Sequence, residues 1–216
     1  MKKTIQFLLV IGMLMSYQII NAQSKVLSKA IQKEYKAKKK ELEKGGWEVF
    51  GSSRSVDVTI LKFYEQLNEN ENLSVVTGLA GAFSQKSIGR AKASVDAQTT
   101  YARQATAVIS GRFINEIGSV SDDVEAEVEK FNSIYEGAVM KEIKNELIEQ
   151  FSIIRQVETT SQGKPVYEMQ TYYFVDNTAA RQARVRAFKS SIGASETLKK
   201  HADKLEEIIK EDVVVE

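Results

Sequence analysis

A long alanine-rich segment from Gly89 to Gly118 constrains the fold of this chain more than any other feature. Its small and apolar residues recur with the period of an α-helix and form one stripe, while most arginines, threonines and glutamines lie on the other faces. The stripe contains Ala91, Val95, Ala102, Ala105, Ile109, Phe113 and Ile117. Small side chains allow another helix or a sheet to approach closely, so we expect one long central helix that organises the packing of the rest. Nothing in the stripe is chemically reactive.

Residues 1–22 have the pattern of a cleaved secretory signal peptide. Two lysines precede an apolar run from Ile5 to Ile20, and Ala22 supplies a small residue for cleavage. A membrane anchor is the alternative, but polar residues interrupt the run, and an anchor needs about 20 predominantly apolar residues. The chain has no cysteine, which excludes a lipid-modified cysteine at the cleavage site. We therefore expect a periplasmic or secreted protein that has no transmembrane anchor after cleavage.

Composition excludes several classes of protein. The 30 basic and 29 acidic residues nearly balance, whereas nucleic-acid binders usually carry a strong basic excess. With no disulfides to form, stability in an oxidising compartment must come from core burial. A 43% hydrophobic content and a single proline are typical of a globular chain rich in regular structure. We expect a charged N-terminal helix over residues 23–45 and a single α+β domain over 46–216.

The first part of that domain mixes helices with short extended segments. Trp47–Phe50 alternates apolar and polar residues like a short strand, a helix is predicted from Val56 to Leu67, and a strand from Leu73 to Val76. We expect Gly78–Phe83 to form a flexible or closely packed turn, because its glycine spacing matches neither the P-loop nor the dinucleotide fingerprint. Trp47 is the only tryptophan, and it has two interpretations, a lid over the core or a surface for stacking carbohydrate.

An amphipathic helix is predicted from Asp122 to Glu149. Its glutamates at 142, 146 and 149 resemble the carboxylates of metal sites and glycosidases, but neighbouring lysines favour a solvated helix face. The clearest β-hairpin follows, over about 147–175. In its second strand Tyr167 and Tyr173 share one face and Tyr172 lies on the other. One face should meet helices, and the other is mixed enough to be partly exposed.

A final helix begins after Asp176, and the sequence leaves open whether it breaks at Gly193. Its arginines Arg181 and Arg184 form a local basic cluster, although neighbouring residues of a helix point in different directions and cannot make an anion cradle unaided. The single histidine, His201, lies in a charged stretch, and no Gly-x-Ser-x-Gly elbow is present. Thiol catalysis is excluded because the chain has no cysteine, and a zinc site with a single histidine would need an unusual ligand set. We therefore predict no catalytic residue, no metal ligand and no cofactor.

Three segments carry a resemblance to known proteins. The alanine-rich helix with Tyr101–Ala105, the hairpin ending Tyr172–Val175 and the second alanine-rich helix at Ala180–Ala187 together resemble the lipoprotein-20-like group of envelope proteins. Gly46–Ser53 is similar to the GWxVFGSS segment of uncharacterised secreted bacterial proteins. The resemblance implies an α+β fold at the cell envelope and transfers no active site. The lipidated cysteine of the lipoprotein is missing here.

These observations lead to one fold prediction and two functional hypotheses. We expect an α+β fold with a small antiparallel sheet, the hairpin plus one or two short strands, packed by several amphipathic helices. The first hypothesis is a non-enzymatic envelope protein that acts through interaction or assembly surfaces, with an envelope partner or further copies of itself. The second is a periplasmic protein that binds a small molecule or glycan with exposed aromatic rings. Candidate ligand or interface residues are Trp47, Tyr167, Tyr172, Tyr173, Arg181 and Arg184.

Overall fold

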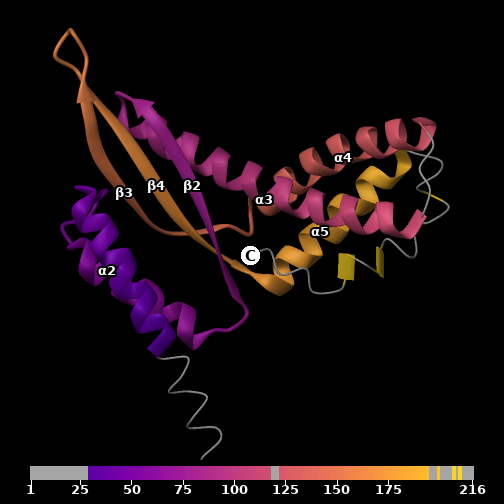
Figure 1. Ribbon diagram of the computed structural model, residues 1–216, viewed down its shortest axis with the longest axis horizontal. Coiled ribbons are helices and arrows are strands. Elements are labelled where there is room, and N and C mark those ends of the chain that lie inside the picture. The colour runs from indigo at the N-terminus through magenta and orange to yellow at the C-terminus, as the bar shows by residue number, and fades with distance from the viewer. Residues whose placement is uncertain (1–28, 118–121, 195–198, 200–205, 208, 211–216) are drawn as a thin grey trace, which may run out of the picture.

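Helices pack on both faces of a four-stranded antiparallel sheet in the computed structural model (Figure 1). The structure describes residues 29–117, 122–194, 199, 206–207 and 209–210. This arrangement confirms the predicted α+β class and the small antiparallel sheet. Within these residues no helix is both long and apolar enough to cross a membrane.

The elements follow one another with short connections. A helix over 29–44 comes first among the described residues. The elements after it are β1 (Glu48–Val49), α2 (Val56–Glu69), β2 (Leu73–Phe83), α3 (Lys86–Ile117), α4 (Asp122–Ile143), β3 (Ile148–Thr159), β4 (Pro165–Asp176), α5 (Asn177–Ser191) and a 3₁₀ turn (Ile192–Ala194).

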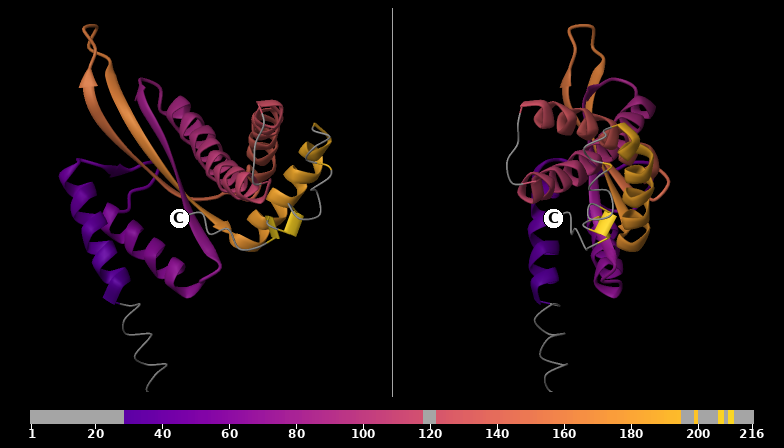
Figure 2. Two further views of the ribbon diagram at one scale, coloured as in Figure 1. Left: turned by 45° about the vertical axis from the view of Figure 1, so that its right-hand side comes forward. Right: turned by 90° about the vertical axis from the view of Figure 1, so that its right-hand side faces the viewer.

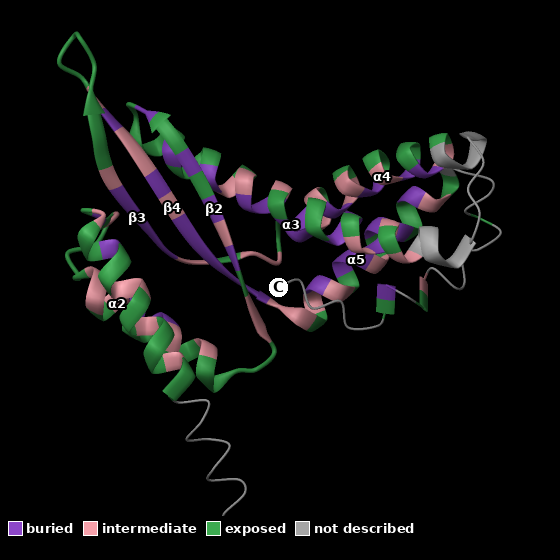
Figure 3. Ribbon diagram, in the orientation of Figure 1, coloured by how far each residue is buried: buried purple, intermediate pink, exposed green. Residues whose placement is uncertain are grey.

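The predicted hairpin is the centre of the sheet, whose strand order is β1-β3-β4-β2. β4 pairs with β3 on one side and with β2 on the other, so that Gln170 lies between Ile153 and Leu79. The tip of the hairpin projects beyond the helices and is exposed (Figures 1 and 3). β2 and the short β1 form the two edges.

Each face of the sheet is covered by a different group of helices (Figure 2). Val76, Tyr173 and Val175 belong to one buried cluster with residues of α3, α4 and α5. On the other face, Tyr172 and Phe174 pack with the N-terminal helix and α2. The prediction leaves open which face is partly exposed; on this face both rings are buried, while Glu168 and Gln170 are half-buried. The cover of the two rings comes from Leu42, Ile60 and Phe63, which are distant in sequence.

The central helix is confirmed as α3, which begins three residues before the predicted start. Ala102, Ala105 and Ile109 are buried as the stripe predicts, but Ala91 and Val95 are exposed. Ala93 and Ala97 occupy the buried face instead. The stripe is therefore wrong at its N-terminal end, because β2 approaches α3 along Ala93 and Ala97 and leaves the flank that carries Val95 open.

The predicted turn at Gly78–Phe83 is instead the second half of β2. The helix backbone explains the glycine there, since a Cβ added at Gly78 would lie 1.9 Å from the carbonyl oxygen of Ala93. The strand pairing does become irregular between Ala80 and Phe83, where Ala82 has a φ of 51°. Gly78 and the buried Ala80 reflect close packing of the strand against α3, whereas a Cβ added at Gly81 would meet nothing within 4 Å.

Two helix ends bear on the predictions. The end of α4 differs from the predicted one, and the end of α5 answers whether the last helix breaks at Gly193. α4 ends at Ile143, and Glu149 belongs to β3, where its backbone pairs with Tyr173 of β4. The amides of Glu146 and Leu147 both donate to the Ile143 carbonyl, which closes a turn before the strand. α5 ends at Ser191, so Gly193 lies in a 3₁₀ turn and the α-helix does not run through it. His201 lies outside the described residues.

Candidate functional site

Trp47, a predicted ligand residue, is a buried part of the core. It belongs to the hydrophobic cluster beneath α2. The guanidinium of Arg155 lies 4.7 Å from its ring centre, and Arg155 also donates to Glu168 at 2.7 Å. A Cβ added at Gly45 would lie 2.7 Å from the indole ring. Trp47 is therefore 9% exposed and has Arg155 over one face of its ring.

The three predicted tyrosines are also largely taken up by packing. Tyr172 and Tyr173 are buried on opposite faces of β4. Tyr167 is half-buried, with its ring 6.2 Å from that of Phe83. Trp47 and these tyrosines do not form an exposed aromatic groove among the described residues. The hypothesis of glycan binding, which needs exposed rings, therefore gains no support from them.

The predicted basic cluster contains a buried arginine. Arg184 of α5 is only 4% exposed. Its Nη1 donates to the hydroxyl of Tyr101 on α3 at 2.5 Å, while its Nε and the hydroxyl of Tyr135 on α4 have no hydrogen-bond partner. Burial raises the pKa of both phenols, and the Arg184 charge offsets this only in part. Arg181 lies one turn earlier and is half-buried. Among the described residues no carboxylate forms an ion pair with Arg184.

The predicted carboxylate row is divided between two arginines, which form three structural ion pairs with it. Arg186 of α5 bonds Glu142 at 2.6 Å and Glu146 at 3.0 Å, which ties α5 to the end of α4. Arg90 of α3 bonds Glu149 of β3 at 2.8 Å. No group of three or more potential metal ligands occurs in the part of the chain that the structure describes.

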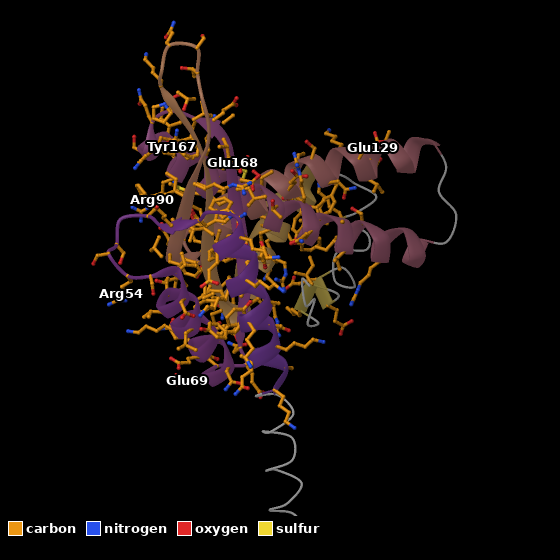
Figure 4. The ribbon with its side chains drawn as sticks, turned by 60° about the vertical axis from the view of Figure 1, so that its left-hand side comes forward. Arg54, Glu69, Arg90, Glu129, Tyr167 and Glu168 are labelled. Carbon is orange, nitrogen blue, oxygen red and sulfur yellow. The ribbon has the colours of Figure 1, made fainter. Side chains whose placement is uncertain are left out.

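A polar hollow of about 280 Å³ lies where the loop before α2 meets β3 and α3. The guanidinium groups of Arg54 and Arg90 come from this loop and from α3, on the same side of the molecule (Figure 4). Ser52 and Thr59 also line it, and the Thr59 hydroxyl already donates to the Ser55 carbonyl. Arg90 is already neutralised by Glu149, so Arg54 supplies the remaining positive charge.

The outer edge of β2 is open. Within the described chain no strand pairs with that edge. None of its 11 residues is charged or proline, although charges and prolines are the usual protection of an edge strand. The amide of Leu79 donates outward, to the carboxylate of Asp96 on α3 at 2.8 Å. Backbone groups of Val75 and Thr77 point the same way as those of Leu79, because strand geometry repeats every two residues.

A wide hollow of about 630 Å³ runs along this edge, between β2 and the flank of α3. Its apolar walls include Leu79, 54% exposed, Val95, 51% exposed, and Ile88. A second hollow, of about 320 Å³, lies on the opposite face of the same strand segment, beside Trp47 and Gln170. The edge of β2 is thus open in its backbone and apolar on both sides, because the register places the side chain of Leu79 on the face away from α3 while Ile88 and Val95 lie on the α3 side.

The candidate ligand or interface residues predicted from the sequence do not include the residues of the β2 edge. Leu79 lies in the segment predicted as a turn and Val95 in the predicted buried stripe, so the sequence indicates neither as a surface residue. One signal was available: Leu73–Phe83 has no charged residue, and its larger apolar side chains alternate in part. The segment lies at the edge of the sheet because β2 pairs with β4 on one side only. That pairing joins residues about 100 positions apart, so the local sequence does not predict it.

The chain was compared with protein-family models, with curated proteins and with solved structures, and none of the three comparisons gave a match.

Proposed function

We propose that this chain is a non-enzymatic, exported protein of the cell envelope that works by binding another protein at the β2 edge. One observation carries the proposal. An uncharged strand edge lies beside an apolar hollow in which Leu79 and Val95 are about half exposed. Exposed apolar surface next to unpaired backbone groups is a common feature of protein interaction sites. Export is supported by the lysines and apolar run of residues 1–22.

The test introduces a photo-crosslinking amino acid, p-benzoylphenylalanine, at Leu79 or at Val95 in the living cell. Val58 of α2, which is also exposed and apolar, is the matched control position. We expect defined crosslinked species from positions 79 and 95 in the envelope fraction and none from position 58. The absence of crosslinks from 79 and 95, or recovery of the chain only in the cytoplasm, would contradict the proposal.

Binding of a small anion is a second candidate, favoured by the polar hollow beside Arg54 and Arg90. The Arg54 guanidinium and the Ser52 hydroxyl are suitable donors to a carboxylate or phosphate. Titration calorimetry with inorganic phosphate tests this function. Saturable heat that disappears in Arg54→Gln would support it, and equal heats from both proteins would refute it.

A further inference from the structure

We infer that the partner of the β2 edge is a second copy of this chain, joined to the first around a two-fold axis through Thr77 of β2 and the Lys92–Asp96 turn of α3. This inference rests on the proposed function and specifies its partner. It follows from three properties of the surface, each of which is complementary to itself.

The strand edge is self-complementary. If two β2 strands pair antiparallel with their axis at Thr77, Val75 of each copy lies opposite Leu79 of the other. Both side chains are exposed in the single chain and lie on the same face of the strand, since they are four residues apart. Directly opposite apolar residues stabilise an antiparallel pair. The pairing would also give partners to the outward backbone groups of Val75 and Thr77.

The flank of α3 is self-complementary in shape. Ile88, Ala91 and Val95 are exposed there and recur at helical spacing. Two copies of this flank would meet antiparallel on the same side of the joined sheet. α3 contacts both β2 and β4, so its axis is set back from the strand edge. With strands about 4.8 Å apart, such a setback places the two α3 axes near the 8–10 Å separation of packed helices.

The charges of that flank are complementary to themselves as well. Lys92 and Asp96 both line the hollow and lie one turn apart. In an antiparallel pair of helices with the axis between them, Lys92 of each copy lies beside Asp96 of the other. Like charges would meet only if the helices were parallel, so the charge pattern selects the two-fold arrangement.

One axis can satisfy both sets of contacts because strand and helix are in register. Gly78 lies against the backbone of Ala93 and the side chain of Ala97, and the Leu79 amide bonds Asp96. The centre of the strand contact is therefore level with the centre of the helix contact. In the single chain, Asp96 occupies one outward donor of the edge. On pairing it would exchange that donor for Lys92 of the second copy.

Sedimentation equilibrium of the purified protein over a wide concentration range tests the inference first. We expect a reversible dimer. Lys92→Asp alone, or Asp96→Lys alone, should raise its dissociation constant about tenfold or more, because like charges then meet twice across the axis. The double variant Lys92→Asp with Asp96→Lys should restore dimerisation. A chain that is monomeric throughout, or a double variant no better than the single ones, would overturn the inference.

Cysteine crosslinking locates the axis independently, since the chain has no cysteine of its own. Thr77→Cys should form a covalent dimer rapidly with a short bismaleimide, whereas Val58→Cys should not. Equal rates at the two positions would place the contact elsewhere. If the purified chain is monomeric while positions 79 and 95 crosslink to a different protein in cells, the proposed function stands and the second copy is excluded.

Discussion

Gly78 shows how a single missing side chain sets the distance between two elements. The backbone of α3 crosses β2 at this residue, and an added Cβ would lie 1.9 Å from the Ala93 carbonyl oxygen. Neighbouring alanines at positions 93 and 97 are completely buried. The close approach therefore depends on the absence of a side chain on the strand and on small side chains along the helix.

Gly78→Ala should therefore destabilise the protein by about 1–3 kcal/mol, the usual cost of overpacking a core. The backbone that the new methyl group meets cannot rotate away as a side chain could. Urea unfolding followed by circular dichroism measures the change as a lower midpoint. Gly81→Ala, three residues along the same strand, is the control, since its Cβ would meet nothing within 4 Å. Equal midpoints for the two variants would show that α3 can move away at little cost.

The N-terminal helix and α2 are joined by a charged contact as well as by the cluster beneath them. Asp57, in the first turn of α2, accepts hydrogen bonds from Tyr35 and from Lys39 at 2.8 Å, both on the N-terminal helix. The bond from Lys39 and then that from Tyr35 lower the pKa of Asp57 below its ordinary value of 3.8. The ionised carboxylate therefore stabilises the contact between the two helices.

This shift predicts how the stability contributed by Asp57 depends on pH. Because the folded pKa is lowered, the stabilisation is complete above about pH 4 and is lost as the pH falls through the folded value. Asp57→Asn should be less stable than the wild type at pH 7, and the difference should shrink as the pH falls below 4. Urea midpoints across that range measure it, with Glu69→Gln at the other end of α2 as the control. A difference that stays constant with pH would refute the assignment.

The three helices on the other face meet around Arg184. Its guanidinium donates to Tyr101, while Tyr135 lies in the same buried cluster. A buried cation that lacks a counter-ion is costly, and replacing it with an apolar residue of similar length is often neutral or stabilising. Removing its acceptor alone leaves a buried donor unsatisfied.

We therefore expect the effects of Tyr101→Phe and Arg184→Met to be strongly coupled. Tyr101→Phe should cost about 1–3 kcal/mol in the wild-type chain, and much less when Arg184 is already methionine. The free energies of unfolding of the four proteins, from urea titrations, give the coupling. Additive effects would show that the hydrogen bond between the two side chains contributes little to stability.

For the molecule as a whole, β4 is the strand that unites the three hydrophobic clusters. Met169, Tyr172, Phe174 and Val175 distribute its side chains among all three, and both of its edges are paired. The hairpin tip at 156–164 is mostly exposed. Local stability should therefore decrease from the middle of β4 towards the tip.

Hydrogen exchange should show this gradient directly. Amides of residues 169–175 should exchange most slowly, with free energies close to that of global unfolding, and those of 156–164 should exchange fastest among the strands. Mass spectrometry of peptic fragments measures both. If β4 exchanged as fast as the tip, the two helical layers would not depend on a common strand.

Local pattern was enough to predict most of the elements. The β-branched and aromatic residues before Asp176 identified the hairpin, and the alanines of the central segment identified α3. The errors occurred where packing overrides local preference. Gly78–Phe83 resembles a turn by composition, but it pairs with β4 as the second half of β2, and α3 packs against the small residues Gly78 and Ala80. For the candidate site, the aromatic and basic residues chosen from the sequence were mostly buried, since large rings and an arginine can fill a core as readily as they can bind a ligand.

Composition supplied the exclusions, and the helical and extended periodicities predicted the α+β class, because such periodicities depend on residues a few positions apart. Which surfaces remain open depends on tertiary packing. Leu79 and Val95 are exposed because β2 pairs with β4 across about 100 residues and because α3 turns its alanines, and not Val95, towards the sheet. Exposure is a property of what lies beside a residue in space, and periodicity along the chain does not contain that information.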